Sequence, residues 1–185
     1  RQMCIRDSSI QTRVLEMSKR EGFFQRIKNF LSEGVEETVS EVVEEILINK
    51  TAQVHIIGIC IETRPDAIDD DWLVRFRNWG VTRIQLGVQH VDNDVLKKIN
   101  RGHTIQKAEW AIEYLKNNCF KIDIHIMPDL PFTTPESDKQ MFDFTYKVLL
   151  PDQIKVYPCA VVPWTIIEKW YNQGKWKPYN PEVLK

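Results

Sequence analysis

The sequence predicts an α/β fold in which helices pack on a parallel sheet. Apolar runs at 54–61, 83–88 and 121–127 predict three strands, and each is followed by a segment with helical periodicity. A short run at 153–157 continues this alternation. Alternating strands and helices build a parallel sheet, because each helix returns the chain to the same edge. Four such units are too few to close an eight-stranded barrel, so we expect an open domain or part of a larger barrel.

Capping residues place the helices between these strands. The expected helix starts are Asp69 to Asp71, Asp92, Thr104 and Thr134, the last followed by Pro135 at the first turn. Glycine is favoured just past a helix end, which predicts ends at Gly80 and Gly174. Pro65 disfavours helix at the residue before it, so 62–66 is expected to form a turn or loop.

The first fifty residues differ from the rest. Residues 1–8 show no periodicity and are treated as extraneous, whereas 9–50 have helical periodicity in two stretches. We therefore predict an N-terminal helical segment at 1–50 and the α/β core at 51–185. The glutamates of the second stretch are interpreted as a solvated helix face.

Composition excludes several classes of protein. The formal net charge of −1 argues against a nucleic-acid binder that depends mainly on charge. No apolar stretch approaches the ~20 residues of a membrane span, and no secretory signal pattern is visible. The 4 cysteines are widely spaced in the sequence, without a CxxC pair, which is typical of buried, reduced thiols. We expect a cytoplasmic protein.

Three polar residues lie where parallel strands or the helices after them end. Glu62 can hold an ammonium group, Gln89 can bind hydroxyls, and Arg101 can hold a carboxylate in bidentate fashion. Working groups of barrels lie past the carboxyl ends of the strands. Together the three match an amino acid joined to a sugar. The alternatives are an ion pair of Glu62 with Arg64 and a helix-capping role for Gln89.

His125 and Asp129 are weaker candidates. A histidine inside a strand is more often a satisfied core residue, and Asp129 lies in a Pro-Asp-Leu-Pro turn. One alternative function is a barrel hydrolase that uses Glu62, His125 and Asp129. The histidines lack zinc-ligand spacing, and the dinucleotide, P-loop and GxSxG motifs are absent from the sequence.

Four ordered motifs resemble one family. They are IETRPD at 61–66, RIQLGVQ at 83–89, NRGHT at 100–104 and HIMPDLP at 125–131. KVYP at 155–158 and GKWKPYNP at 174–181 continue the pattern. In order and spacing they resemble the catalytic subunit of Elongator, the radical-SAM enzyme that modifies the wobble uridine of tRNA. The resemblance covers about residues 55–185.

This resemblance implies a partial parallel (β/α)6 barrel that holds a [4Fe–4S] cluster and S-adenosylmethionine. The cofactor would yield a 5′-deoxyadenosyl radical, which activates an acetyl group from acetyl-CoA for transfer to carbon 5 of the uridine. By similarity, Glu62 would bind the methionine amino group, Gln89 the ribose and Arg101 the methionine carboxylate. His125 would lie in the same pocket. The implied partners are tRNA and Elongator-like subunits, with no membrane.

The chain departs from this family at its front. It lacks the three-cysteine cluster motif, and Cys60 and Cys119 fall at other positions. The chain is therefore expected to be a fragment with the later barrel strands, inactive alone. A non-catalytic remnant that acts as a binding module stays an alternative beside the hydrolase.

We predict that this polypeptide does not assemble a stable [4Fe–4S] cluster. Cluster sites use closely spaced thiolates, and the four cysteines here are far apart in sequence. Anaerobic reconstitution followed by iron counting and electron paramagnetic resonance tests this expectation. A stoichiometric cluster signal would contradict it.

Overall fold

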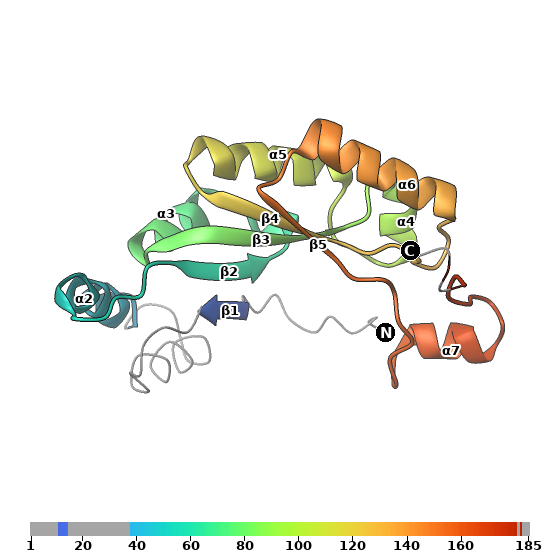
Figure 1. Ribbon diagram of the computed structural model, residues 1–185, viewed down its shortest axis with the longest axis horizontal. Coiled ribbons are helices and arrows are strands. Elements are labelled where there is room, and N and C mark those ends of the chain that lie inside the picture. Colours follow the sequence, from blue (N-terminus) through green and yellow to red (C-terminus); the bar gives the residue numbers. More distant parts are fainter. Residues whose placement is uncertain (1–10, 15–37, 181, 183–185) are drawn as a thin grey trace.

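The computed structural model describes residues 11–14, 38–180 and 182. Its centre is a single sheet with the strand order β1-β2-β3-β4-β5 (Figure 1). The strands are β1 (Gln11–Val14), β2 (Ile59–Thr63), β3 (Val81–Gln89), β4 (Lys121–Ile126) and β5 (Gln153–Val156). Neighbouring strands from β2 to β5 pair in parallel, and β1 pairs antiparallel with β2. The predicted α/β fold with four parallel strands is confirmed.

Most helices cover one face of this sheet. In chain order they are α2 (Thr38–Thr51), the short 3-10 helix η1 (Pro65–Ala67), α3 (Asp70–Asn78), α4 (Asn93–Lys98), α5 (Ile105–Asn117), α6 (Pro135–Phe144), the π-helical turn η2 (Thr145–Leu149) and α7 (Ile166–Asn172). Helices α3, α5 and α6 lie on the same side of the strands, while α2 and α7 lie at opposite ends of the molecule (Figure 1). None of the helices in the described ranges is long and apolar enough to span a membrane.

The expected helix signals are confirmed. Asp69, Asp92, Thr104 and Thr134 each accept a hydrogen bond from a backbone N–H of the first turn that follows. Gly80 and Gly174 follow helices with φ of 69° and 67°, in the left-handed region. These caps satisfy backbone groups that a helix end leaves unpaired.

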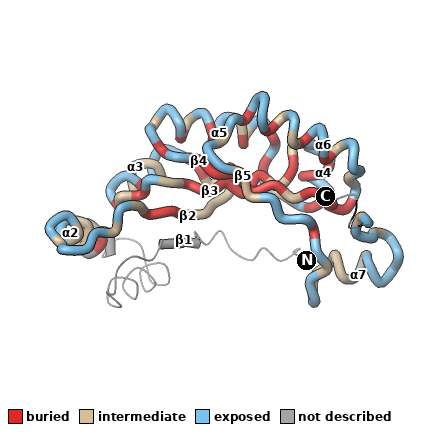
Figure 2. The backbone as a smooth tube through the Cα atoms, in the orientation of Figure 1, coloured by how far each residue is buried: buried red, intermediate tan, exposed pale blue. Residues whose placement is uncertain are grey.

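The core lies between the sheet and the helices that cover it. Ile84, Leu86 and Ile124 are fully buried, as the alternation of side chains on β3 and β4 requires. Figure 2 shows that much of β3 and β4 is buried. Ala108 and Ala111 of α5 are also fully buried. Because their side chains are small, α5 can approach the strands closely.

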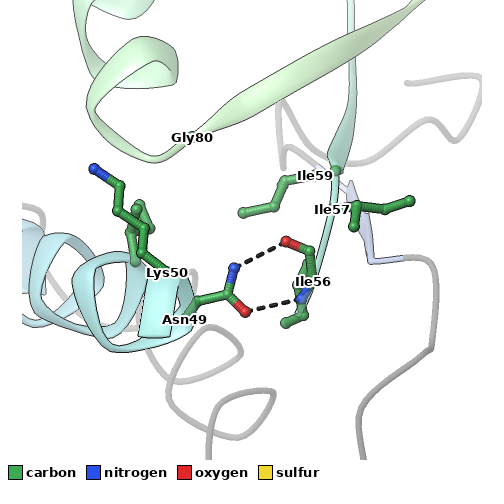
Figure 3. Close-up of a pocket in the computed structure, with 8 residues that line it drawn as sticks. Asn49, Lys50, Ile56, Ile57, Ile59 and Gly80 are labelled. Carbon is green, nitrogen blue, oxygen red and sulfur yellow. Dashed lines mark hydrogen bonds between the residues drawn. The ribbon is translucent and has the colours of Figure 1, made fainter. Parts of the chain in front are cut away.

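Strand β2 begins later than the apolar run predicts. Val54 and Ile57 are 58% and 89% exposed and precede the strand. The side-chain amide of Asn49 both donates to the Ile56 carbonyl and accepts from the Ile56 N–H, which ties this approach to α2 (Figure 3). A hollow of about 170 Å³ lies there, and its lining residues include four isoleucines, Asn49 and Gly80. It is at the amino ends of β2 and β3, opposite the predicted site.

The expectation of helix from residue 9 is wrong at Gln11–Val14. This segment is strand β1, and its pairing gives hydrogen-bond partners to the edge of β2. Helix α2 confirms the end of the second helical stretch, whereas residues 1–10 and 15–37 lie outside the described residues. The division of the chain at residue 50 stays a prediction.

The packing of β3 against the helices predicts a large loss of stability for Leu86→Ala. The side chain is fully buried, so its truncation leaves a cavity and should lower the free energy of unfolding by roughly 2–5 kcal/mol. Val74→Ala on α3 is the control, because that side chain is 56% exposed. Urea unfolding measures both, and equal midpoints would contradict this account of the core.

Candidate cofactor-binding site

Polar side chains line the face of the sheet that α3, α5 and α6 do not cover. In the strand register Glu62 is paired with Gln85, and Gly87 is paired with His125. His125 is paired in turn with Lys155 of β5. Residues in register point to the same face, so these four strands bring their polar groups to one surface. In a barrel this surface is the interior.

Glu62 and His125 contact each other across this surface. The Oε1 atom of Glu62 is 3.2 Å from Nδ1 of His125, although the two belong to different strands. The other ring nitrogen of His125 is 3.2 Å from Oε1 of Gln85, and its ring lies edge-on to Tyr157. His125 is therefore a satisfied buried histidine, as the residue type favours, and its partners are groups of the candidate site.

Gln85 connects the polar residues and was not a sequence candidate. Its Oε1 accepts a 2.6 Å hydrogen bond from Nζ of Lys155, and its Nε2 donates to Asp123 over 3.3 Å. Asp123 is 1% exposed and also pairs with Arg83. A signal for these residues exists in the sequence, because polar side chains occupy alternate positions of two otherwise apolar strands.

Gln89 and Arg101 meet above Gly87. A Cβ atom at Gly87 would lie 3.0 Å from Nη2 of Arg101 and 3.0 Å from Nε2 of Gln89, so only glycine leaves room for both. Nη2 of Arg101 donates to the Gly87 carbonyl over 2.5 Å. Nε of Arg101 and Oε1 of Gln89 are buried and have no hydrogen-bond partner among the described residues. Buried polar atoms without a partner are costly, and a bound ligand would satisfy them.

The loop before α5 holds Arg101 in place. Asn100 follows the end of α4 with a φ of 59°, and the backbone N–H of Arg101 donates to the Leu96 carbonyl over 2.8 Å. Burial and the nearby Arg64 lower the pKa of Arg101 to about 10, while Asp66 acts in the opposite direction. Arg101 therefore stays charged at neutral pH. The negative charge of Asp66 offsets only part of this positive charge.

His103 supports the same loop. Its Nε2 lies 3.3 Å from the Val88 carbonyl, which accepts only, so this nitrogen carries the proton. Burial, followed by the charge of Arg101, lowers the pKa of His103 to about 4. The ring is thus neutral at pH 7 and adds no positive charge beside Arg101.

Asp129 does not join these residues. Its carboxylate accepts from the backbone N–H of Tyr179 over 2.8 Å, and its own N–H donates to Asp138. Burial raises the pKa of the Asp129 carboxyl group. The structure brings Glu62, Gln89, Arg101 and His125 to one end of the sheet but gives Asp129 a structural role in its loop. The hydrolase arrangement of Glu62, His125 and Asp129 is therefore not formed.

The cysteines do not gather either. Cys60 and Cys159 are buried, as expected, but Cys119 is exposed, which corrects the expectation for that residue. Within residues 11–14, 38–180 and 182, no three His, Cys, Asp or Glu side chains could hold a metal ion together. Cys4 lies outside the described residues. The described part of the chain thus does not fit an iron–sulfur cluster.

Comparison with known proteins identifies the family. The model of the Radical SAM superfamily matches residues 6–144. The chain belongs to this superfamily. The match begins well before residue 55, where the motif resemblance was expected to start, so that expectation was too narrow.

Comparison with curated proteins shows which members of the superfamily this chain resembles. A tRNA uridine(34) acetyltransferase of Methanocaldococcus infernus is 34% identical over 169 residues, which are 90% of this chain and 31% of the relative. Elongator complex protein 3 of Schizosaccharomyces pombe is 33% identical over 92% of this chain and 31% of its own length. The chain thus spans about a third of these relatives. The solved structure of Methanocaldococcus infernus Elp3 with an N-terminal deletion has a TM-score of 0.71 at 37% identity and covers 76% of this chain and 33% of the other. The predicted resemblance to the catalytic subunit of Elongator is confirmed, as is the radical-SAM type of α/β fold.

The pKa of His103 predicts a pH-dependent contribution to stability. Its folded-state pKa of about 4 is below the ordinary value, so the unfolded chain binds the proton first as the pH falls. Stability from the neutral ring is present above pH ~6.5 and is lost as the pH falls toward ~4, by roughly 1–2 kcal/mol at pH ~5. His103→Gln keeps a donor for Val88 and should remove this part of the pH dependence. Urea unfolding of both proteins at several pH values measures it, and parallel pH profiles would contradict the assignment.

Proposed function

We propose that this chain is part of a radical-SAM enzyme that transfers an acetyl-derived group to carbon 5 of the wobble uridine of tRNA. In this proposal Glu62, Gln89, Arg101 and His125 hold S-adenosylmethionine. One observation carries the assignment: two buried polar atoms, Arg101 Nε and Gln89 Oε1, have no hydrogen-bond partner in the described chain, and both side chains lie over Gly87. A chain of this superfamily would satisfy them with its cofactor.

The two partnerless atoms differ in chemistry. Nε of Arg101 is a charged donor, and one Nη group of the same side chain is already fixed on Gly87, so the guanidinium is oriented before a carboxylate binds. Oε1 of Gln89 is a neutral acceptor that suits a ribose hydroxyl. The missing side chain of Gly87 leaves room for both groups to lie over the backbone.

Glu62 supplies the opposite charge. Its side chain remains 30% exposed, so the carboxylate can still accept from an ammonium group while His125 holds one oxygen. His125 is fixed in turn by Gln85, which Lys155 and Asp123 keep in one orientation. The carboxylate of Glu62 on β2 and the guanidinium of Arg101 in the loop before α5 give the site the charge pattern of an amino-acid group.

The residues of this chain would bind and orient the cofactor. The cofactor would supply a carbon-centred radical for hydrogen abstraction only on accepting one electron from a [4Fe–4S] cluster, for which the described residues offer no ligand set. The acetyl group from acetyl-CoA, the tRNA substrate, further Elongator-like subunits and a cytoplasmic location are part of the same proposal. Support for the tRNA comes from the relatives, which are named tRNA uridine(34) acetyltransferase and Elongator complex protein 3. We also propose that the chain divides into two parts, residues 1–50 and residues 51–185.

The proposed roles predict an order of losses in cofactor affinity. Arg101→Ala removes a charge-assisted contact of roughly 1.5–3 kcal/mol, and Gln89→Ala removes a neutral contact of about 1 kcal/mol. Glu62→Gln should fall close to the arginine variant, because it keeps the shape but removes the charge. Calorimetric titration of the chain with S-adenosylmethionine measures the three affinities.

Lys139→Ala is the matched control, since this residue is exposed on α6, which covers the other face of the sheet (Figure 1). Circular dichroism shows whether each variant is folded. Wild-type affinity in folded Glu62 and Arg101 variants would remove the cofactor-site assignment.

A further inference from the structure

Gln89 lies in a strained turn at the carboxyl end of β3. Gly87 is paired with His125 and Gln89 with Ile126, so β3 holds one more residue than β4 at this point. A bulge of this kind bends a strand and re-aims the side chain beside it. The backbone of Gln89 has a φ of 70°, in the left-handed region that a residue with a side chain rarely adopts. The direction of the Gln89 side chain therefore depends on this turn.

Two hydrogen bonds close the turn. The backbone N–H of His90 donates to the Val88 carbonyl over 2.9 Å, and the backbone N–H of Met127 donates to the Gln89 carbonyl over 2.8 Å. A three-residue turn that is closed in this way, with a positive φ at its centre, is rare and strained. Such a conformation persists only where the surrounding structure holds it. Because His90 closes the turn, whatever fixes His90 also fixes Gln89.

The ring of His90 is fixed by two helices. It is almost completely buried, and its Nδ1 accepts a 3.0 Å hydrogen bond from the backbone N–H of Asp92, the N-cap of α4. Because Nδ1 accepts this bond, it carries no proton, and the ring proton lies on Nε2. Nε2 faces α6, where it lies 3.4 Å from Oδ1 of Asp138. The other oxygen of Asp138 accepts from the backbone N–H of Asp129 over 2.7 Å, which holds this carboxylate in place.

Packing alone does not account for a histidine at this position. An apolar side chain would fill the same buried space without two ring nitrogens that need partners. The imidazole adds a fixed link from residue 90 to Asp92 and a contact with α6, directly after the strained residue. The link lies where the turn has to be held.

The turn controls one group of the candidate site. Nε2 of Gln89 lies over Gly87, and Oε1 is buried without a hydrogen-bond partner among the described residues. Because no such bond fixes Oε1, the direction of the amide depends on the backbone that carries it.

We propose that His90 is a positioning residue that holds the turn at Gln89, and so holds the Gln89 amide over Gly87 before the cofactor binds. This inference rests on the proposed function, in which Gln89 contacts the ribose of S-adenosylmethionine. His90 acts without contact with the cofactor. It limits the backbone conformations that residue 89 samples in the free chain, so less ordering remains to be done on binding.

The position of the Gln89 amide in the free 185-residue chain is the first measurement. Its side-chain amide signals are read in proton–nitrogen correlation spectra and are assigned by their absence from Gln89→Ala. His90→Leu keeps an apolar group in the buried space but removes the acceptor for Asp92, so the Gln89 signals should shift or broaden. His90→Asn places an amide oxygen near the position of Nδ1 and should restore the wild-type signals.

His90→Gln is a second variant for the same measurement. Its amide reaches the position of Nε2 but not that of Nδ1, so it should also shift the Gln89 signals. It replaces His90→Leu if circular dichroism shows that the leucine variant does not fold.

Cofactor affinity is the second measurement, and it separates positioning from a general loss of stability. In calorimetric titration His90→Leu should weaken binding of S-adenosylmethionine by about fivefold, as expected for the Gln89 contact itself. The variant that carries both His90→Leu and Gln89→Ala should bind no more weakly than Gln89→Ala alone, because His90 acts through that side chain. Independent effects would instead multiply to roughly 25-fold.

Leu115→Ala is the control for stability. This fully buried side chain lies in the last turn of α5, which ends near the amino end of β4. The variant should lower the midpoint of urea unfolding, because it leaves a cavity, and should leave both the Gln89 signals and the cofactor affinity unchanged.

Unmoved Gln89 signals in folded His90→Leu or His90→Gln would overturn the inference, whether or not the chain binds the cofactor. So would losses of affinity that multiply when His90→Leu and Gln89→Ala are combined, or a His90→Asn variant that behaves as His90→Leu does. Absence of S-adenosylmethionine binding by the wild type would contradict the proposed function instead. The Gln89 signals of the free chain would still decide the role of His90.

Discussion

The opposite chemistry of the two sheet faces is the constraint on which the rest of the structure depends. Along β3, Ile84, Leu86 and Val88 face the helices and are fully buried, while Gln85 and Gly87 face the other side. The parallel register repeats this pattern on β4 and β5. A shift of one residue would turn the polar set into the core and the apolar set out of it. The packing of the helices thus fixes the register, and the register fixes the site.

The polar face is held by its own hydrogen bonds. Asp123 is almost completely buried, which is tolerable because Arg83 and Gln85 both contact its carboxylate. Through Gln85 this arrangement reaches His125 and Lys155. Loss of one partner would leave a buried polar group unpaired, which costs more than the missing bond alone. The groups that orient Glu62 are therefore part of a connected set and do not act as single contacts.

Backbone strain is concentrated past the carboxyl ends of the strands. Gln89, Asn100, Asp129, Phe132 and Trp164 all have positive φ and lie in or next to these connections. Left-handed conformations of residues other than glycine persist only where the surroundings hold them. Here the surroundings are caps and hydrogen bonds, such as those of Asp138 with Asp129 and of Glu168 with Trp164.

Much of this architecture is local and could be predicted from the sequence. The caps at Asp92 and Thr104 and the apolar alternation of β3 and β4 depend on neighbouring residues, so they identified helices, strands and the parallel sheet. The same rule located Glu62, Gln89 and Arg101 at strand or helix ends. It failed at Gln11–Val14, because that strand exists through its pairing with β2, a contact across the chain that helical periodicity does not reveal.

The sequence by itself determined the fold class, the positions of most elements and the residue types at the mouth of the sheet. Only the tertiary structure decided which of these residues meet. It paired Glu62 with His125 and placed Arg101 and Gln89 over Gly87. It also directed the carboxylate of Asp129 to the backbone N–H of Tyr179, away from the site. The reason is physical: capping and alternation act over a few residues, whereas side-chain contacts between strands depend on register, and register is set by packing of the whole sheet.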